Sequence, residues 1–341
     1  MWTSRPHTAR RATLLLGAAT MTPLALLTAQ APPAQAFGTV NALGQHAEHE
    51  RITRAALACA PGTPSDGTCF EPRSLDQVAG HKGTFGAVGA PDTDEVATPE
   101  AHCDNADFLA APGYPRGREE ATRQLQACVA KLQTRFAEGV AAAGGTLKPD
   151  GTIDAGESNL AKSCTFTLGL PGRNKCEAIE GFGRALHGVQ DFYSHSNWAD
   201  AAGDRPLGKD NPPGLNLPGP SPLLALSTGR PPAASAVPRE LTTGCFSLVP
   251  LGCSKRVQHS GLNKDTGLID PATGATGGPT TARGKVGDNF DRAVQAAVAD
   301  TRRQWSDFRA ALTARYGKDR ARSIGCALTH DDPARDCAPK G

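Results

Sequence analysis

The chain has 341 residues, of which 36 are lysine or arginine and 34 are aspartate or glutamate, so its formal net charge is +2. This near balance gives no basic footprint for nucleic acid. Only 5% of the residues are aromatic, whereas 38 are glycine and 27 are proline, which predicts a chain rich in loops.

Residues 1–36 are predicted to be a secretory signal peptide. They hold three arginines and no acidic residue, then a leucine-rich run, and they end on Ala34-Gln35-Ala36, a small-residue pattern that signal peptidase accepts. Phe37 is the expected mature N-terminus, and cleavage changes the formal charge to 2 − 3 = −1. A transmembrane anchor is the alternative, but Pro23 interrupts a run already short of the roughly 20 residues that a span needs.

All ten cysteines follow the expected cleavage point, and an even number in an exported chain favours disulfide bonds over free thiols. The count alone does not fix the connectivity, and we expect successive cysteines to pair locally. The five expected pairs are Cys59–Cys69, Cys103–Cys128, Cys164–Cys176, Cys245–Cys253 and Cys326–Cys337. A cysteine zinc site is the alternative, which the absence of any CxxC spacing disfavours. The expected location is extracellular.

Apolar residues that recur every three or four positions predict the main helices. The predicted helices cover residues 46–59, 117–143, 174–196 and 286–316. Between the first two, residues 61–112 contain many glycines and prolines, which argues against long regular elements. Residues 202–240 are rich in proline and predict an irregular surface excursion or a flexible linker. With no internal repeat and no trusted strand pattern, the expected fold is a single mainly α domain over residues 37–341, with long irregular loops stapled by disulfides.

Three ligand-type side chains stand four residues apart on the third predicted helix. His187, Asp191 and His195 form one stripe at about 100° per residue. The outer two are separated by roughly 12 Å of helical rise, so they do not easily share one ion, whereas Asp191 can bridge two neighbouring ions with its two oxygens. The spacing therefore favours a cluster of metal ions over a single site.

The ordinary alternative is two buried histidines hydrogen-bonded to the backbone, with a solvated aspartate between them. The flanking residues Leu186, Val189, Phe192 and Tyr193 predict a shielded face, where an unpaired carboxylate is costly without a cation. The segment also gathers two of the chain's nine histidines in nine residues. Metal binding is therefore the favoured interpretation.

The segment HGVQDFYSHSNW, together with an HxxI spacing close behind the expected cleavage site, resembles the superfamily of zinc-dependent phospholipases C, fungal single-strand nucleases and Het-C-type proteins. The segment itself is most similar to the Het-C-like branch. The opening FGTVNALGQHAEHERITRAALAC looks like secreted CinY-type proteins of lantibiotic clusters. The likeness covers residues 37–59 and 183–200 and is weaker over 85–110.

The resemblance implies a phospholipase C-like fold with three clustered zinc ions, held by histidines, carboxylates and the mature N-terminus. It assigns the N-terminal role to Phe37 and the first histidine role to His49, ahead of His46. The loop ligands would be Asp92 and His102, with Asp104 or Asp107 as local substitutes. It also assigns the HxxxD pair to His187 and Asp191, with Asp191 as the bridge.

The chain departs from the family pattern at two places, so a site with two zinc ions is as plausible as a site with three. The enzymes place a histidine six residues after the bridging aspartate, where this chain has Asn197, and His195 comes four residues after it. They also carry a later histidine followed four residues on by an acid. Here the candidate ligand His259 has Asn263 four residues on, with Asp265 two residues beyond. The remaining histidines at 81 and 330 are expected to be ordinary surface or loop residues.

These inferences predict a secreted zinc-dependent phosphoric ester hydrolase that cleaves a phosphodiester with metal-activated water, with Asp92 as a water-orienting ligand. Motifs for serine hydrolases, P-loop proteins and HExxH proteases are absent. A phospholipid, reached through transient contact with a membrane surface, is favoured over nucleic acid because the mature charge is near neutral. The alternatives are a non-catalytic, metal-stabilised binding protein of the same fold, and a disulfide-stapled protein with purely structural histidines.

Overall fold

The computed structural model describes residues 37–39, 41, 45–166, 171–249 and 251–337. The predicted signal peptide lies outside these residues. The described chain is mainly helical, as the sequence predicts. Its long helices are α1 (Glu48–Leu57), α4 (Arg118–Ala143), α6 (Asn174–His195) and α8 (Asn289–Tyr316). All four predicted helices are confirmed to within three residues at either end.

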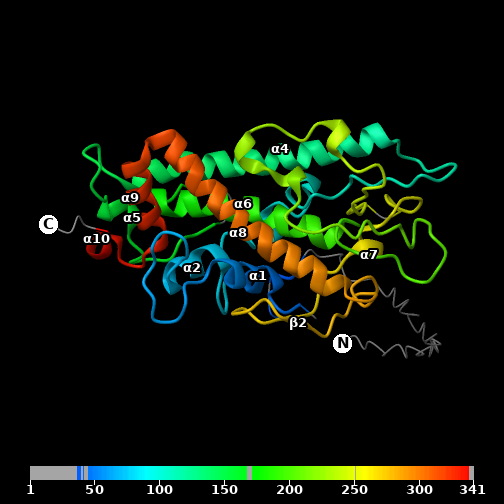
Figure 1. The fold of residues 1–341 in the computed structure, drawn as a ribbon, viewed down its shortest axis with the longest axis horizontal. Helices are drawn as coiled ribbons and strands as arrows, with labels where there is room; N and C mark the ends of the chain where they lie inside the picture. The colour runs from blue at the N-terminus through cyan, green and yellow to red at the C-terminus, as the bar shows by residue number, and fades with distance from the viewer. Residues whose placement is uncertain (1–36, 40, 42–44, 167–170, 250, 338–341) are drawn as a thin grey trace, which may run out of the picture. The chain divides into compact units, whose positions relative to one another are not determined.

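Helix α6 lies between the other long helices and carries the predicted ligand stripe (Figure 1). It is buried on nearly every side. Glycines allow this close packing, because a Cβ added at Gly181 would lie 2.5 Å from the backbone nitrogen of Gly139 on α4. Helix α1 packs on α8 through its apolar face, which includes Ile52 and Ala55. The ligand stripe is thus fixed inside the helical core.

Shorter elements connect the long helices. They are α2 (Pro72–Ala79), α3 (Pro91–Asp94), η1 (Pro99–Ala101), η2 (Gly144–Thr146), α5 (Ala155–Ser158), η3 (Pro222–Leu224), η4 (Leu226–Thr228), η5 (Ala234–Ala236), α7 (His259–Leu262), α9 (Lys318–Thr329) and α10 (Pro333–Asp336). The strands β1 (Leu268–Ile269) and β2 (Thr276–Gly277) pair antiparallel, with Leu268 opposite Gly277. As predicted, residues 61–112 contain only short elements.

The proline-rich residues 202–240 are irregular, as predicted, but the expected surface excursion is wrong for part of them. Leu223, Leu224 and Leu226 are at most 2% exposed. The backbone there is held by buried side chains, since Gln304 donates to the Leu224 carbonyl oxygen at 2.8 Å. Proline content correctly predicts the lack of regular structure, whereas the leucines bury the segment against α8.

All five expected disulfide pairs form. Their Cα–Cα separations range from 4.8 to 5.9 Å. The bond between Cys103 and Cys128 joins the loop that carries His102 to helix α4. A disulfide therefore restrains one of the predicted ligands next to α6. Within the described ranges, none of the helices combines the length and the apolar character needed to cross a membrane.

Candidate metal centre

The ligand stripe of α6 is fully buried. His187, Asp191 and His195 are each 0% exposed. Asp191 uses its two oxygens in different directions, because Oδ2 lies 3.0 Å from Nε2 of His187 and Oδ1 lies 3.8 Å from Nε2 of His195. The outer histidines therefore meet opposite sides of one carboxylate, as the spacing predicts.

The first ligand group surrounds Asp191 on the side of His187. Nε2 of His49, from α1, lies 3.2 Å from Oδ1 of Asp191, and Nδ1 of His102 lies 3.0 Å from Oδ2. Asp92 of α3 completes the group, with its Oδ1 3.7 Å from Nε2 of His187. A zinc ion with four ligands in a tetrahedral arrangement, at bond lengths of roughly 2.0–2.1 Å, places the ligand atoms about 3.3 Å apart. Ligand atoms lie close enough together for such an ion in two overlapping sets that share His187: His49, His187 and Asp191, and Asp92, His102 and His187.

Hydrogen bonds outside the group fix which ring nitrogens face inward. His187 can only donate from Nδ1 to the Val88 carbonyl oxygen at 2.9 Å, which leaves a lone pair on Nε2. In the same way, Nε2 of His102 lies 3.3 Å from the Glu95 carbonyl oxygen, so Nδ1 is the nitrogen that faces the group. Backbone acceptors behind ligating histidines are the usual outer support of a metal site.

His49 is oriented by a side-chain amide. Its Nδ1 lies 2.7 Å from Oε1 of Gln190, while the amide nitrogen of Gln190 donates to the hydroxyls of Thr53 and Thr301. With the amide in this orientation, Oε1 accepts a hydrogen bond from Nδ1 of His49, so Nε2 faces Asp191 and is the nitrogen that a cation would bind.

A second ligand group lies on the other side of Asp191. His195 and His259 both approach Oδ1 of Asp104 through Nδ1, at 3.3 and 3.1 Å. Their Nε2 atoms approach the two oxygens of Asp265, at 3.3 and 3.4 Å. All four side chains are at most 5% exposed. Two imidazoles and one of the two carboxylates thus form a second place where a cation fits, and the other carboxylate lies behind the rings, where it can orient them.

Atoms without partners concentrate in this centre. Among the described residues, four buried side-chain polar atoms have no hydrogen-bond partner, and three of them belong to His49, Asp191 and His195. The fourth is Oε1 of Gln304. Buried polar atoms are otherwise almost always paired, so partnerless nitrogen and oxygen atoms that converge on one place fit a bound cation. The residues present fit zinc, which takes imidazole nitrogen and carboxylate oxygen.

The electrostatics of the centre link proton binding to cation binding. Burial lowers the pKa of His187 by more than the charge of Asp191 raises it, so this imidazole is neutral at pH 7. Burial and the charge of His195 also lower the pKa of His259, but Asp104 and Asp265 outweigh them and raise it to about 9. Without a cation, protons on the histidines offset the buried carboxylates. Protons and metal therefore compete for this centre.

No protein-family model, curated protein or solved structure matches this chain. The phospholipase C-like resemblance therefore stays a prediction from the residues that carry it. The geometry of the centre is an independent argument, because it follows from the side-chain contacts alone.

The predicted N-terminal residue lies beside the centre. Phe37 is 0% exposed, and its ring meets the His49 ring edge-on with centroids 5.8 Å apart. The next residue, Gly38, accepts a hydrogen bond from the backbone nitrogen of His49 at 3.3 Å. His46, the less favoured choice, belongs to none of the ligand groups that the described residues form. The ligand role of the Phe37 amine stays a prediction.

Other predicted residues have separate outcomes. Asp104, expected only as a local substitute, belongs to the second group, whereas Asp107 lies outside the centre and pairs with Arg256. Asn197, at the position where the resemblance implies a histidine, accepts from the Thr242 backbone nitrogen at 2.9 Å. His330 is a loop residue, as expected, but it is buried. Its neighbours Cys326 and Cys337 are joined by a disulfide and have no thiolate to offer a metal.

Asp265 is the ligand candidate that sequence reasoning missed. It was noticed only as an acid at the wrong spacing after His259. The structure shows why the spacing fails, because α7 ends at Leu262 and the chain then extends to bring Asp265 back to His259. A search for any acid within several residues of His259 would have found it.

The centre reaches solvent most readily at Asp92, whose side chain is 20% exposed. Oδ2 of Asp92 accepts a hydrogen bond from the hydroxyl of Thr39. Thr39 also lines a groove of about 670 Å³, together with Arg51 and Lys82. Neither cation has a carboxylate within ion-pair distance among the described residues. A groove lined by three cations and by one carboxylate, that of Glu50, thus adjoins the exposed edge of the centre.

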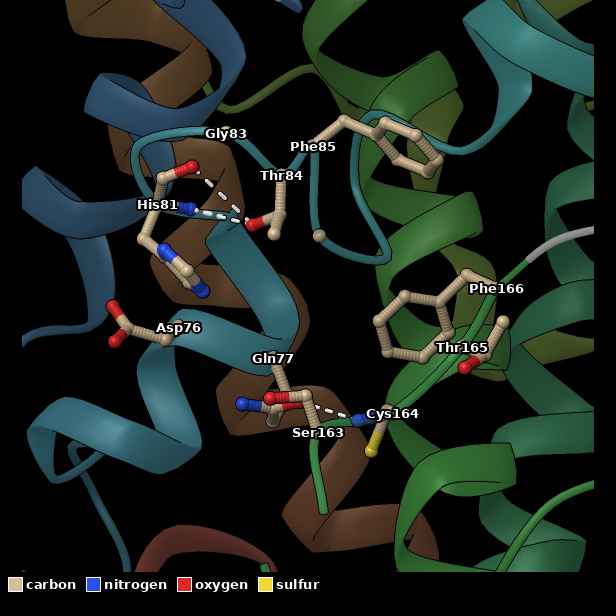
Figure 2. A pocket seen from close by; sticks show the side chains of 11 residues that line it. Asp76, Gln77, His81, Gly83, Thr84, Phe85, Ser163, Cys164, Thr165 and Phe166 are labelled. Carbon is tan, nitrogen blue, oxygen red and sulfur yellow. Dashed lines mark hydrogen bonds between the residues drawn. The ribbon is translucent and has the colours of Figure 1, made fainter.

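A smaller hollow of about 180 Å³ is also bordered by the loop that begins at His81 (Figure 2). His81 and Thr84 border both hollows. Figure 2 shows local hydrogen bonds here, between His81 and Thr84 and from the Cys164 backbone nitrogen to Gln77 at 2.7 Å. We assign no ligand to this hollow.

Proposed function

We propose that this protein is a secreted zinc-dependent phosphoric ester hydrolase with phospholipase C-like chemistry. One observation carries the proposal: Oδ2 of Asp191 lies 3.0 Å from Nε2 of His187 in the first group, and Oδ1 lies 3.8 Å from Nε2 of His195 in the second. A buried carboxylate that faces ligand atoms on both sides can bridge two cations. Pairs of close cations are characteristic of enzymes that displace phosphate esters.

The two ligand groups define which side chains would hold the ions. The first group offers His49, Asp92, His102, His187 and one or both oxygens of Asp191. The second group offers Asp104, His195, His259 and Asp265. Bound zinc would offset the charge of a phosphodiester and activate a water molecule at neutral pH. No serine or cysteine nucleophile is then required.

Asp92 is the side chain best placed to act on water. Its Oδ1 faces His102 and His187, while Oδ2 is held by the hydroxyl of Thr39. This restraint on one oxygen fixes the direction of the carboxylate. Because Asp92 is also the most exposed member of the first group, it can orient a solvent molecule and accept its proton.

The groove beside Asp92 favours an anionic ester as substrate. Arg51 donates to the Ile269 carbonyl oxygen at 2.7 Å, which steadies its cation at the wall of the groove, and Lys82 is exposed. A volume of about 670 Å³ is in the range typical of small-molecule sites. A phospholipid headgroup is favoured over nucleic acid because the charge of the mature chain is near neutral.

A non-catalytic, metal-stabilised binding protein is the second candidate. The burial of the ligands favours it, because the other side chains of both groups are at most 7% exposed and only Asp92 is clearly open to solvent. A cation enclosed in this way can stabilise the fold without meeting a substrate.

Turnover of a soluble chromogenic phosphodiester by the zinc-loaded mature protein separates the two candidates. The hydrolase predicts turnover that falls by about 10²–10⁴-fold in Asp92→Asn, the range for loss of general base catalysis. Asp150→Asn, an exposed aspartate away from the centre, is the control and should keep wild-type turnover. Zinc-loaded protein with no turnover of phosphodiesters would leave the binding protein as the function.

A further inference from the structure

The Cys245–Cys253 disulfide closes a short loop, and we call its described residues, 245–249 and 251–253, the tip loop. Its apolar side chains lie in solvent: Leu248 is 62% exposed, Val249 69% and Leu251 84%. Six large hydrophobic side chains are exposed among the described residues, and three of them belong to this loop. Single exposed leucines are ordinary, but a cluster on one small loop marks an interaction surface.

The backbone of the tip loop holds these side chains outward. Gly252 donates to the Val249 carbonyl oxygen at 3.1 Å, and Ser254 donates to the Leu251 carbonyl oxygen at 3.0 Å. Ser247 also accepts from the Val249 nitrogen at 3.1 Å. These bonds engage part of the polar backbone of the loop, and the large side chains that it exposes are apolar.

The base of the tip loop is built into the candidate metal centre. The backbone nitrogen of His259 donates to the Cys245 carbonyl oxygen at 2.9 Å, and that of Gly244 donates to the His195 carbonyl oxygen at 3.0 Å. The Phe246 ring lies 6.0 Å from the His259 ring, between centroids. The disulfide and these contacts fix the apolar tip relative to the second ligand group.

A cation flanks the apolar tip. Lys255 follows the closing cysteine, is exposed, and has no carboxylate within ion-pair distance among the residues described. The next residue, Arg256, is instead engaged by Asp107. Apolar side chains beside an unpaired lysine are the pattern of segments that enter the boundary between lipid headgroups and acyl chains.

We propose that the tip loop docks the protein on a phospholipid bilayer. Leu248, Val249 and Leu251 enter the apolar boundary, and Lys255 contacts lipid phosphates. A protein partner fits less well, because three side chains fall far short of the roughly 800 Å² that each side of a stable protein interface buries. The identification of the bilayer as the source of substrate rests on the proposed function, whereas docking itself requires no turnover.

Cosedimentation of the zinc-loaded mature protein with vesicles of phosphatidylcholine and phosphatidylserine tests the proposal. The variant Leu248→Ser/Leu251→Ser should bind the vesicles roughly a hundredfold more weakly, because two leucines lose their burial in lipid. Lys255→Glu should bind the same vesicles at least about fivefold more weakly. The matched control is Leu268→Ser on β1, where a leucine that is 52% exposed lies outside the tip loop, and it should bind as the wild type does.

Three outcomes would overturn docking: no binding of the wild type to vesicles, equal binding of the double variant, or self-association of the wild type that the double variant abolishes. Circular dichroism and zinc content of each variant confirm an intact fold. Turnover of a soluble phosphodiester, measured without vesicles, tests the proposed function separately from docking. Turnover without vesicle binding rejects docking alone, and vesicle binding without turnover rejects the hydrolase alone.

Discussion

Nδ1 of His102 lies 2.8 Å from Nε2 of His187, and Oδ2 of Asp191 lies 3.0 Å from each of them. The opposite ring nitrogens of both histidines face backbone carbonyl oxygens, so the two nearby nitrogens carry lone pairs. Two lone pairs and a carboxylate at this distance repel one another unless a proton or a metal cation lies between them. This relationship is the physical reason for placing an ion there.

Removal of metal should destabilise the fold. A chelator leaves the buried carboxylates of Asp191 and Asp265 without their cations, and a ligand held at 100 times its dissociation constant stabilises by about 3 kcal/mol. For a chain of this size we expect the thermal midpoint to fall by roughly 5 °C. Differential scanning calorimetry with and without chelator measures the change. Zinc should restore the midpoint and magnesium should not, since the centre is rich in imidazole; an unchanged midpoint in chelator would show that the histidines are structural.

Gln190 is expected to act as a positioning residue for His49. Replacement by leucine removes the acceptor that holds Nδ1 at 2.7 Å, so zinc affinity should fall by about 10–100-fold while the helix stays folded. Competition with a zinc-binding dye measures the affinity. Gln133→Leu on α4 is the matched control, since Gln133 is also buried but bonds backbone carbonyls away from the centre, such as that of Arg230 at 2.8 Å. Equal affinities for the two variants would contradict this role.

Asp265 should be required for the second ion only. Asp265→Asn removes the charge that faces His195 and His259, at 3.3 and 3.4 Å, but leaves the first group intact. We expect the zinc content to fall by one ion per chain, with cobalt-substituted protein keeping the absorption of the first site. Loss of no ion would show that Asp265 is only a hydrogen-bond partner of these histidines.

The stability of the fold should depend on pH through Lys175, a buried lysine away from the centre. Burial lowers its pKa from 10.5 to about 7 in the native state, while its amine donates to the His330 carbonyl oxygen at 2.7 Å. Between these values the unfolded chain binds a proton that the folded chain has released, so the free energy of unfolding rises as pH increases from 7 towards 10.5.

Urea unfolding of the wild type and of Lys175→Met at pH 7 and pH 9 measures this dependence. The free energy of unfolding should rise by roughly 2 kcal/mol more for the wild type than for the variant between pH 7 and pH 9. The variant keeps the carbonyl of His330 satisfied, because the hydroxyl of Ser74 also donates to it at 2.9 Å. Lys131→Met, at a partly exposed lysine on α4, should behave as the wild type. Parallel pH dependence of the wild type and Lys175→Met would rule out a neutral Lys175.

The long helices were predictable because their apolar residues repeat with the helical period. Helix α9 was not predicted. It begins directly after Gly317, whose φ is 80°, and it packs against α8, a contact that the local sequence pattern does not reveal. The buried leucines at 223 and 224 were missed for a related reason, because local proline content says nothing about what a segment meets in space. Pairing successive cysteines along the chain correctly predicted all five disulfides, whose sequence separations range from 8 to 25 residues.

The centre was predictable where ligands share one helix. The stripe from His187 to His195 follows from spacing alone, and so does the bridging position of Asp191. The partners from other segments depend on how loops return to α6, which a spacing rule does not contain. For this reason Asp265 was overlooked, and the choice between Asp104 and Asp107 stayed open until the structure placed only Asp104 beside His195.

The most direct test of the central claim is the zinc content of the mature protein purified from an exporting host, for the wild type and for Asp191→Asn. Asp300→Asn is the matched control, because Asp300 is equally buried on α8 and bonds Tyr193 at 2.6 Å outside the centre. We predict two or three zinc ions per chain in the wild type and the control, and their loss in Asp191→Asn. Absence of metal from all three proteins, or an unchanged content in Asp191→Asn, would contradict a metal centre bridged by Asp191.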